Sequence, residues 1–420
     1  MELGENEKVT FKHKKYEDVF FITLCIIGAF AILSTTMSKN PVLNPFAESL
    51  ETPETLMGFV AAASTLPGIL FSLPAGFLSD HLGRKKVLLV SSIVFASAPF
   101  LYIFINSWWQ LILVRFYHGF ATAIFVPVAR AAVVERYTSK RGERISTFTS
   151  ATIVGRGIAP FFGGFILSIT LWNFRIVYLI VSIIGLAVFL MTLLFLKEQN
   201  DTSRVNLPKS SYSPSQENDE SESTYGWKDV FKNRDILIVS STEAGARYVY
   251  GALEFFFIGY LKDIAQLDPS LIGMIVGMQF ILVPIISPFM GKLSDRLGRR
   301  MIILIGLMIS GFPLIAIPYI TSFFPLLAIS LIYGFGFSMV ISSTPALVGD
   351  LARKETYGIA MGFLATIMDV GQMLGPIITG LILVTFGYSG SFLSLGIILL
   401  GLCIFFSVYR KLIPQKALKK

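Results

Sequence analysis

The sequence predicts an all-α membrane protein in which twelve transmembrane helices form two pseudo-symmetric six-helix bundles. The first reason is composition: 54% of the 420 residues are hydrophobic and only 15% are charged, whereas a soluble protein must cover its surface with polar groups. The second is that the charges cluster and leave apolar stretches long enough to cross a bilayer, which takes about 20 helical residues. The third is that one loop sequence occurs in both halves of the chain.

Twelve apolar stretches are expected to form the spans. They are uniformly apolar and do not alternate with polar residues, which favours helices over the strands of a membrane barrel. With the N-terminal residues 1–17 carrying charges of both signs and no small-residue cleavage site, no removable signal peptide is expected. The stretches lie near 19–37, 56–78, 87–106, 109–134, 146–169, 174–196, 235–261, 270–290, 300–320, 322–349, 357–385 and 388–409.

The basic residues predict that both termini are cytoplasmic. With the N-terminus inside, the inside segments hold 28 of the 35 Lys and Arg residues, and the outside segments hold only Lys39, Arg175 and Lys262. This asymmetry fixes the orientation by the positive-inside rule. It also accounts for the net charge of +8 without a nucleic-acid partner. We therefore expect a multi-pass protein of the inner or plasma membrane.

A polar, Ser-rich and acidic run, SSYSPSQENDESEST at 210–224, separates the sixth and seventh spans. Such a composition cannot form a core and is typical of a flexible tether. The expected organisation is a cytoplasmic tail at 1–17, an N-terminal six-helix bundle at 18–197, a cytoplasmic linker at 198–233, a C-terminal six-helix bundle at 234–410 and a cytoplasmic tail at 411–420.

The two halves repeat each other. The sequence AGFLSDHLGRKKV at 75–87 follows the second span, and MGKLSDRLGRRMI at 290–302 follows the eighth. At the same offset Gly119 matches Gly334, and Glu135 matches Asp350. An internal repeat of six spans with the same direction through the membrane is the sequence sign of a transporter with two parallel halves.

With the G-x-L-S-D-x-x-G-R loop in both halves, the chain resembles a transporter of the major facilitator superfamily over nearly its whole length. The resemblance implies that these loops latch the halves together on the cytoplasmic side when the central cavity opens outward. A glycine at 76 would let two helices approach closely, and one at 83 permits a turn with positive φ. The predicted latch residues are Gly76, Asp80, Gly83, Arg84, Glu135, Asp295, Gly298, Arg299 and Asp350, with Arg84 able to pair with Glu135.

Two further motifs strengthen the resemblance. In the fourth span Arg115 and His118 precede Gly119, similar to the R-x-x-[QH]-G pattern that proton-coupled members link to proton movement; a structural polar network is the alternative for Arg115. The fifth span resembles the G-x-x-x-G-P-x-x-G-G motif of drug-exporting antiporters, with Ala159 in place of one glycine. The residues expected to bend and pack these helices are Gly155, Pro160, Gly163 and Gly164, with Gly375 and Pro376 in the eleventh span.

Ionisable residues near mid-membrane are the candidates for the transport pathway, because charges in spanning helices face the protein interior and mark ion or substrate paths. Asp369 is the favoured proton site, and Glu243, Glu254 and Arg115 are further proton-coupling candidates. Arg156 could displace a proton or bind an anionic group. Glu243 and Arg247 stand at i and i+4, so a permanent ion pair is the alternative for them. The substrate-cavity candidates are Arg156, Arg247, Tyr248, Tyr250 and His118.

The sequence therefore predicts a secondary transporter, functional as a monomer, that exports small amphipathic or drug-like molecules in exchange for protons. Proton-coupled uptake or exchange of a polar metabolite or organic anion is the alternative. A membrane-embedded enzyme or a transporter-like receptor is disfavoured, because neither a catalytic cluster nor a folded output domain is visible. The three histidines are scattered, and Cys25 and Cys403 lack partners at metal-ligand spacing, so no metal or cofactor beyond the coupling proton is expected.

Overall fold

The computed structural model describes residues 5–137, 141–196, 230–353 and 356–412. Every regular element in these ranges is helical, which confirms the all-α prediction. The predicted linker at 198–233 lies mostly outside the described residues, as do residues 413–420 of the predicted tail at 411–420. The elements are α1 (Glu5–Met37), α2 (Leu43–Ser49), α3 (Glu54–Ala62), α4 (Leu66–Leu82), α5 (Arg84–Tyr102), α6 (Trp108–Arg136), α7 (Arg141–Ile169), α8 (Phe174–Phe195), α10 (Arg234–Asp263), α11 (Pro269–Leu297), α12 (Arg299–Ala316), the 3₁₀ turn η2 (Ile317–Tyr319), α13 (Phe323–Leu351) and α14 (Tyr357–Leu412).

Ten helical segments of the described chain are both long and apolar enough to cross a membrane. The helix α10 adds an eleventh span, although its charged residues lower its hydropathy. The helix α14 supplies two spans, since its 56 residues would reach about 84 Å if straight, against a hydrocarbon core of about 30 Å. Gly387, at φ 64° and ψ −170°, breaks it between the two predicted spans.

Local sequence explains where several helices begin. Asn173, Asn233 and Asp268 accept hydrogen bonds from backbone N–H groups in the first turns of α8, α10 and α11, which satisfies donors that have no partner within the helix. Gly83 and Gly298 adopt φ of 91° and 92° between α4 and α5 and between α11 and α12. The positive φ expected at Gly83 is therefore present, and Gly298 adopts nearly the same φ in the second copy of the loop.

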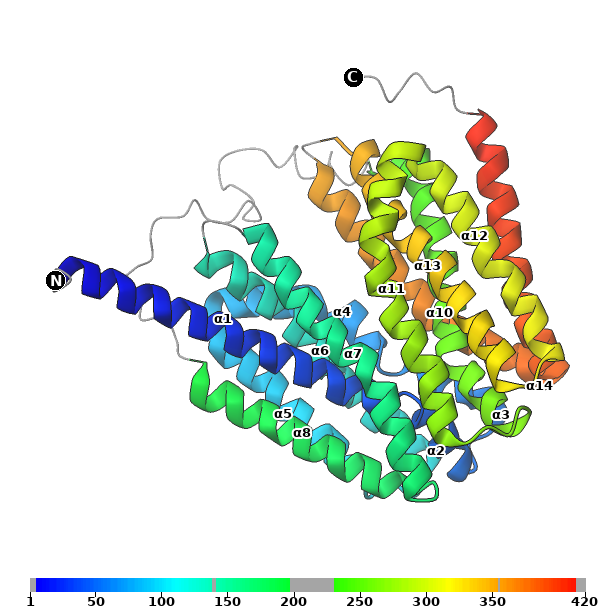
Figure 1. The fold of residues 1–420 in the computed structure, drawn as a ribbon, viewed down its shortest axis with the longest axis horizontal. Coiled ribbons are helices and arrows are strands. Elements are labelled where there is room, and N and C mark those ends of the chain that lie inside the picture. The colour runs from blue at the N-terminus through cyan, green and yellow to red at the C-terminus, as the bar shows by residue number, and fades with distance from the viewer. Residues whose placement is uncertain (1–4, 138–140, 197–229, 354–355, 413–420) are drawn as a thin grey trace.

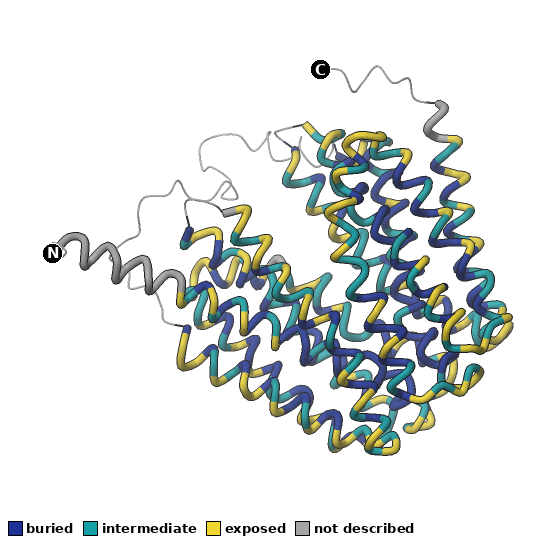
Figure 2. Tube along the Cα trace, viewed as in Figure 1, coloured by how far each residue is buried: buried dark blue, intermediate teal, exposed yellow. Residues whose placement is uncertain are grey.

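The helices form two bundles, α1 to α8 and α10 to α14 (Figure 1). The C-terminal bundle has one large hydrophobic core, which runs from Val230 to Phe406. The N-terminal bundle has two smaller cores. One of these two takes in Phe255 and Phe256 of α10, both fully buried, so apolar packing is continuous between the bundles at that level. Figure 2 shows buried chain concentrated where the bundles meet.

Among the described residues, the closest backbone contacts between the bundles lie toward one side of the molecule. We call the side where α1 begins and α14 ends the terminal side, and the side that holds the α1–α2 and α10–α11 connections the far side (Figure 1). Near the far side, a Cβ atom at Gly164 of α7 would lie 2.4 Å from the backbone oxygen of Pro269 and 2.9 Å from the Cα atom of Gly273 of α11. A Cβ atom at Gly58 of α3 would lie 2.1 Å from the backbone oxygen of Pro376 of α14. Glycine therefore lets the two bundles touch through their backbones.

The loop glycines on the terminal side have no such contact. A Cβ atom at Gly76 or Gly291 would meet nothing within 4 Å. The expectation that Gly76 supports a close helix approach is therefore wrong for this conformation. The physical reason is that close packing between the bundles lies toward the far side, so the terminal side is the more open of the two in the described part of the chain.

Candidate functional site

Two charged side chains of α10 form a buried ion pair in the C-terminal bundle. Arg247 Nε donates to Glu243 Oε1 at 3.1 Å, and the side chain of Glu243 is 0% exposed against 20% for Arg247. The i,i+4 spacing predicted this pair. The second carboxylate oxygen of Glu243 is buried with no hydrogen-bond partner in the described part of the chain. Arg247 also lies over the ring of Phe337, with its guanidinium carbon 5.5 Å from the ring centroid.

Asp369 lies on α14, half-buried, and none of the described residues donates a hydrogen bond to it or forms an ion pair with it. Arg247 is the charge that acts on it. Two glycines of α14 let it pack closely against α10 beside Asp369. A Cβ atom at Gly371 would lie 2.2 Å from the backbone oxygen of Ala244, and one at Gly375 would lie 2.0 Å from the backbone oxygen of Tyr248. Asp369 is therefore a mid-helix carboxylate without a fixed partner beside an arginine.

The two tyrosines predicted to line a cavity differ in their placement. Tyr248 is half-buried, and its hydroxyl lies 3.4 Å from the Thr379 hydroxyl on α14. Tyr250 is only 7% exposed and stacks on Phe337 with the ring centroids 4.9 Å apart. Phe337 in turn stacks on Tyr333. The cavity prediction for Tyr250 is corrected here, since its ring belongs to the packing of α10 against α13.

Arg156 presents an exposed side chain from the middle of α7. Its neighbours in sequence are buried glycines: a Cβ atom at Gly155 would lie 2.1 Å from the backbone oxygen of Ala29, and one at Gly157 would lie 2.6 Å from Ile281 of α11. The helix is thus held tightly between the two bundles while Arg156 stays accessible. The positive charge of Arg156 acts on Tyr250 and Glu254 of α10. Because both of these residues belong to the C-terminal bundle, Arg156 lies opposite that bundle.

Arg115 and His118 lie inside the N-terminal bundle and are each 1% exposed. Arg115 Nη2 donates to Ser64 Oγ at 2.5 Å, in the break between α3 and α4. The Tyr102 hydroxyl lies 3.4 Å from His118 Nδ1. The prediction that His118 lines the substrate cavity does not fit this placement, because His118 points into the bundle core. The polar network that was the alternative for Arg115 is present.

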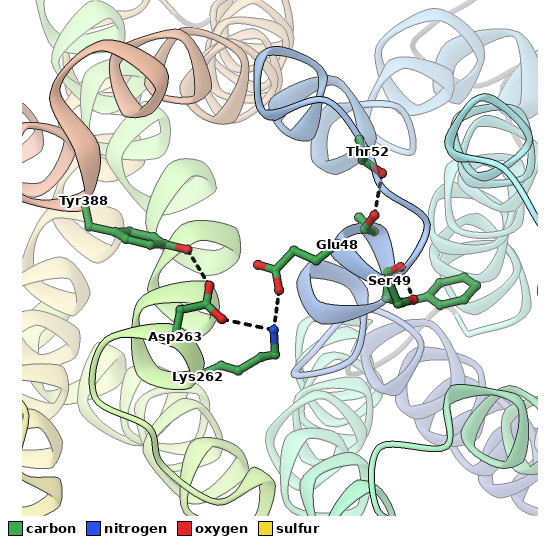
Figure 3. A network of polar contacts seen from close by, with 8 residues as sticks. Glu48, Ser49, Thr52, Lys262, Asp263 and Tyr388 are labelled. Atoms are coloured by element: carbon green, nitrogen blue, oxygen red, sulfur yellow. Dashed lines mark hydrogen bonds and ion pairs between the residues drawn. The ribbon is translucent and has the colours of Figure 1, made fainter.

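The far side is closed by polar contacts between the bundles. Lys39 Nζ donates to Glu254 Oε2 at 2.6 Å, and Asn40 Nδ2 donates to Glu254 Oε1 at 3.0 Å. Lys262 lies between Asp263, at 3.0 Å, and Glu48 of α2, with which it forms an ion pair. Figure 3 shows this group, with Tyr388 reaching Asp263 from α14. We call these contacts the far-side seal; its members are Lys39, Asn40, Glu48, Glu254, Lys262 and Asp263.

The charges of the seal depend on one another. Burial raises the pKa of Glu48, and the hydrogen bond from Lys262 opposes this shift. Burial acts to lower the pKa of Lys262, but its contacts with Glu48 and Asp263 outweigh burial and raise the pKa. Burial lowers the pKa of Lys39, with Glu254 acting against it. Each lysine of the seal therefore keeps its charge largely through a carboxylate partner.

The sequence pattern did not identify the seal. Its ion pairs join residues 214 and 215 positions apart, and no motif links them. One signal was available: Lys39 and Lys262 are two of the only three basic residues on the predicted outside. Glu254, predicted only as a proton-coupling candidate, turns out to be the carboxylate that holds Lys39.

The predicted latch residues pair within their own bundles. Arg84 Nε donates to Glu135 at 3.0 Å and also pairs with Asp80. In the second copy Arg299 lies 2.9 Å from Asp350 and 3.4 Å from Asp295. The first copy thus connects the end of α6 to the turn between α4 and α5, and the second connects the end of α13 to the turn between α11 and α12. Among the described residues, no ion pair joins either copy to the other bundle. This is the arrangement expected while the terminal side is open.

The comparisons with known proteins agree with this architecture. The chain is 24% identical over 388 residues to the multi-drug resistance efflux pump PmrA of Streptococcus pneumoniae, covering 90% of this chain and 92% of that protein. It is 24% identical over 321 residues to the multidrug resistance protein MdtG of Proteus mirabilis, covering 76% of each. It is also 24% identical over 349 residues to an uncharacterized MFS-type transporter of Methanocaldococcus jannaschii, covering 81% of this chain and 85% of that one.

Solved structures with the same fold include a bacterial homologue of the human lysosomal transporter Spinster, with a TM-score of 0.79 and 16% identity over 94% of this chain and 97% of that one. The nucleoside transporter NupG gives a TM-score of 0.77 and 14% identity over 93% and 99%. The sequence profile of the Major Facilitator Superfamily matches residues 19–261 and 244–420, which together span nearly the whole chain. The chain therefore belongs to the Major Facilitator Superfamily and is a multi-pass membrane transporter.

Proposed function

We propose that this transporter exports small amphipathic molecules in exchange for protons by alternating access. The observation that carries the proposal is a set of accessible charges in the middle of helices of both bundles. Arg156 comes from the N-terminal bundle, Arg247 and Asp369 come from the C-terminal bundle, and all three are accessible although they lie in mid-helix. Charges at this depth default to a transport pathway. The relatives PmrA and MdtG, whose names record drug efflux and multidrug resistance, support the direction.

The sidedness follows from the basic residues. With the terminal side in the cytoplasm, 28 of the 35 Lys and Arg residues lie on cytoplasmic segments, as the positive-inside rule requires. The structure would then be the conformation that receives substrate from the cytoplasm, with the far side closed toward the exterior. Rocking of the bundles about the Gly164–Gly273 contact would reverse the access.

In this proposal Asp369 carries the proton. It has no fixed hydrogen-bond partner among the described residues, it is partly accessible, and it lies beside Arg247. A carboxyl in such a place exchanges a proton in response to nearby charge. A cationic amphipathic substrate would compete with the proton for Asp369, which couples the two movements.

The test uses purified protein in vesicles that contain a pH-sensitive dye, under an imposed proton gradient. A lipophilic cation should trigger proton movement in the wild type, and Asp369→Asn should abolish it. Glu51→Gln, on an exposed far-side turn, is the matched control and should behave as the wild type does. Full proton movement in Asp369→Asn would remove Asp369 from the mechanism.

Exchange or uptake of an organic anion is the second candidate. It is favoured by the two accessible arginines, Arg156 and Arg247, which come from different bundles and could hold one carboxylate or phosphate between them. Proton movement triggered only by anions, and lost in Arg156→Ala, would favour this candidate. Unchanged substrate affinity in Arg156→Ala would exclude it.

A further inference from the structure

We propose that Glu254 is the residue through which proton binding opens the far side, with Lys39 as the cation that competes with the proton. This inference rests on the proposed proton coupling. It adds to the role of Asp369: Asp369 exchanges its proton with substrate, and Glu254, a residue of the seal, links proton binding to opening of the far side. The carboxylate of Glu254 would bind a proton when the far side opens and would lose it to water when Lys39 returns, with Lys39 remaining an ammonium throughout.

The first argument is that the charges around Glu254 belong to the other bundle. The carboxylate sits on α10 of the C-terminal bundle and is 9% exposed. Lys39 and Asn40 bind its two oxygens from the α1–α2 connection of the N-terminal bundle. Arg156, the third positive neighbour, lies on α7 of the same N-terminal bundle. The groups that face Glu254 from its own bundle are the phenols of Tyr250 and Tyr333.

Opening the far side must therefore strip Glu254 of Lys39 and Asn40. A carboxylate that loses a cation and an amide donor in a poorly solvated place is stabilised by protonation. A proton, like any ligand, shifts a conformational equilibrium only by the difference in its affinity for the two states. Glu254 supplies that difference, because its counter-charges depend on how the bundles are placed.

The other mid-helix carboxylates do not meet this condition. Glu243 is paired with Arg247 four residues further along the same helix, so rocking of the bundles leaves the pair intact. Asp369 has Arg247 as its charged neighbour, again within the C-terminal bundle. Glu243 and Asp369 therefore keep Arg247 as their charged neighbour when the C-terminal bundle moves as a unit. They can carry a proton, but they cannot by themselves make proton binding open the far side.

The direction of the effect fits export. In the conformation described here the far side is closed and Lys39 holds Glu254 at 2.6 Å, which leaves no place for a proton on that oxygen. Protonation from the exterior would stabilise the open far side, and closure would bring Lys39 back and expel the proton. The positive charge of Arg156, which acts on Glu254, would also favour loss of the proton when the far side closes. One proton would thus enter from outside and leave inside in each cycle.

The more exposed carboxylate of the seal, Glu48, provides a control. Burial raises the pKa of Glu48, with Lys262 opposing and Asp263 reinforcing this shift. The Glu48–Lys262 pair is more exposed than Glu254, with side chains 27% and 30% exposed against 9%, and Asp263 stays beside Lys262 on the same helix, so this pair contributes less to the difference between the two conformations. Removing Glu48 should therefore leave acid-driven opening in place, whereas removing Glu254 should abolish it.

The test measures the distance between spin labels on the two bundles at the far side. Cysteines replace Asn106 and Thr321, two exposed residues that take no part in the seal, and alanine replaces the native Cys25 and Cys403. Spectra are taken in lipid nanodiscs without substrate, from about pH 8 to about pH 5.5, a range in which a buried carboxyl titrates. We call the share of molecules in which the two labels are far apart the long-distance population. In the protein with no other change, we expect acid to raise the ratio of open to closed molecules by up to about tenfold for each unit by which the pKa of Glu254 differs between the two conformations.

Three variants then decide the matter. Glu254→Gln should give a long-distance population that no longer responds to pH. Lys39→Gln should weaken the pH response and move its midpoint to higher pH, because the cation that lowers the proton affinity of Glu254 in the closed conformation is gone. Glu48→Gln should keep acid-driven opening. If Glu254→Gln retains the pH response of the parent protein, or if the Lys39→Gln midpoint does not move, the inference is overturned.

This outcome is separable from that of the proposed function. The distance measurement needs no substrate, whereas the dye measurement asks whether any compound moves protons. A parent protein that moves protons while Glu254→Gln keeps its pH-dependent distances overturns only the role of Glu254. A parent protein that moves no protons with cations or anions overturns the proposed coupling, whatever the distances show.

Discussion

Replacing Arg247 with methionine while Glu243 stays in place is expected to lower the free energy of unfolding by about 3–5 kcal/mol, because it leaves a buried charge without its partner. Glu243 is 0% exposed, and one of its oxygens already lacks a hydrogen-bond partner among the described residues. Denaturant unfolding in detergent micelles, followed by tryptophan fluorescence, would give the difference.

The double variant Glu243→Met with Arg247→Met is the informative companion. Replacing both members of a buried pair by apolar residues of similar size is often neutral or stabilising, so most of the lost stability should return. The pair Arg299–Asp350, with side chains 23% and 39% exposed, is the matched control, and Arg299→Met should cost only about 0–1 kcal/mol. Equal losses at both sites would contradict the assignment of Glu243–Arg247 as a structural pair.

Joining the bundles across the far side is expected to stop transport completely. Ser168 Oγ at the end of α7 donates to Asp268 Oδ2 at the start of α11 over 3.1 Å, and both residues are accessible. Cysteines at these two positions in a background without Cys25 and Cys403 should react with a short bis-methanethiosulfonate reagent. A bridged protein cannot open its far side, so transport should fall to the level of protein-free vesicles and should return when the bridge is reduced.

The single-cysteine variants are the controls for this experiment. Asp268→Cys also removes the cap of α11, which costs about 1 kcal/mol, and the reagent should have no further effect on it. Bridged protein that transports at the unbridged rate would show that the far side does not need to open, and the rocking mechanism would be wrong.

Local sequence rules identified the features that depend on neighbouring residues. The helix spans follow from apolar length, and the left-handed turns at Gly83 and Gly298 follow from a motif in which only glycine is unstrained. The pairs Arg84–Glu135 and Glu243–Arg247 follow from a repeated motif and from i,i+4 spacing. These predictions needed no knowledge of how the bundles are placed.

Predictions that depended on which way a side chain points were less successful. His118 and Tyr250 carry the right chemistry for a cavity, but their helix faces turn them into the bundle cores, at 1% and 7% exposure. Gly76 has the right size for a helix contact, but its helix end has no neighbour in this conformation. A sequence gives the residue type and its period along the helix, whereas the partner helix is set by tertiary packing.

The far-side seal could not be predicted from the sequence for a related reason. Lys39 and Glu254 meet because the α1–α2 connection folds against the last turns of α10, 215 residues away in the chain. In the alternating-access cycle proposed above, the contacts of the seal would form in one conformation and break in the other. The sequence must encode both conformations at once, so it does not mark the contacts of either.

The most direct test of the account is the direction of substrate movement in membrane vesicles of known orientation. Inside-out vesicles with an acidic interior should accumulate a lipophilic cation, a protonophore should release it, and Glu254→Gln vesicles should not accumulate it. Right-side-out vesicles under the corresponding gradient should show no accumulation. Accumulation of an organic anion in right-side-out vesicles, with no movement of the cation in either orientation, would contradict the exporter and favour the uptake alternative.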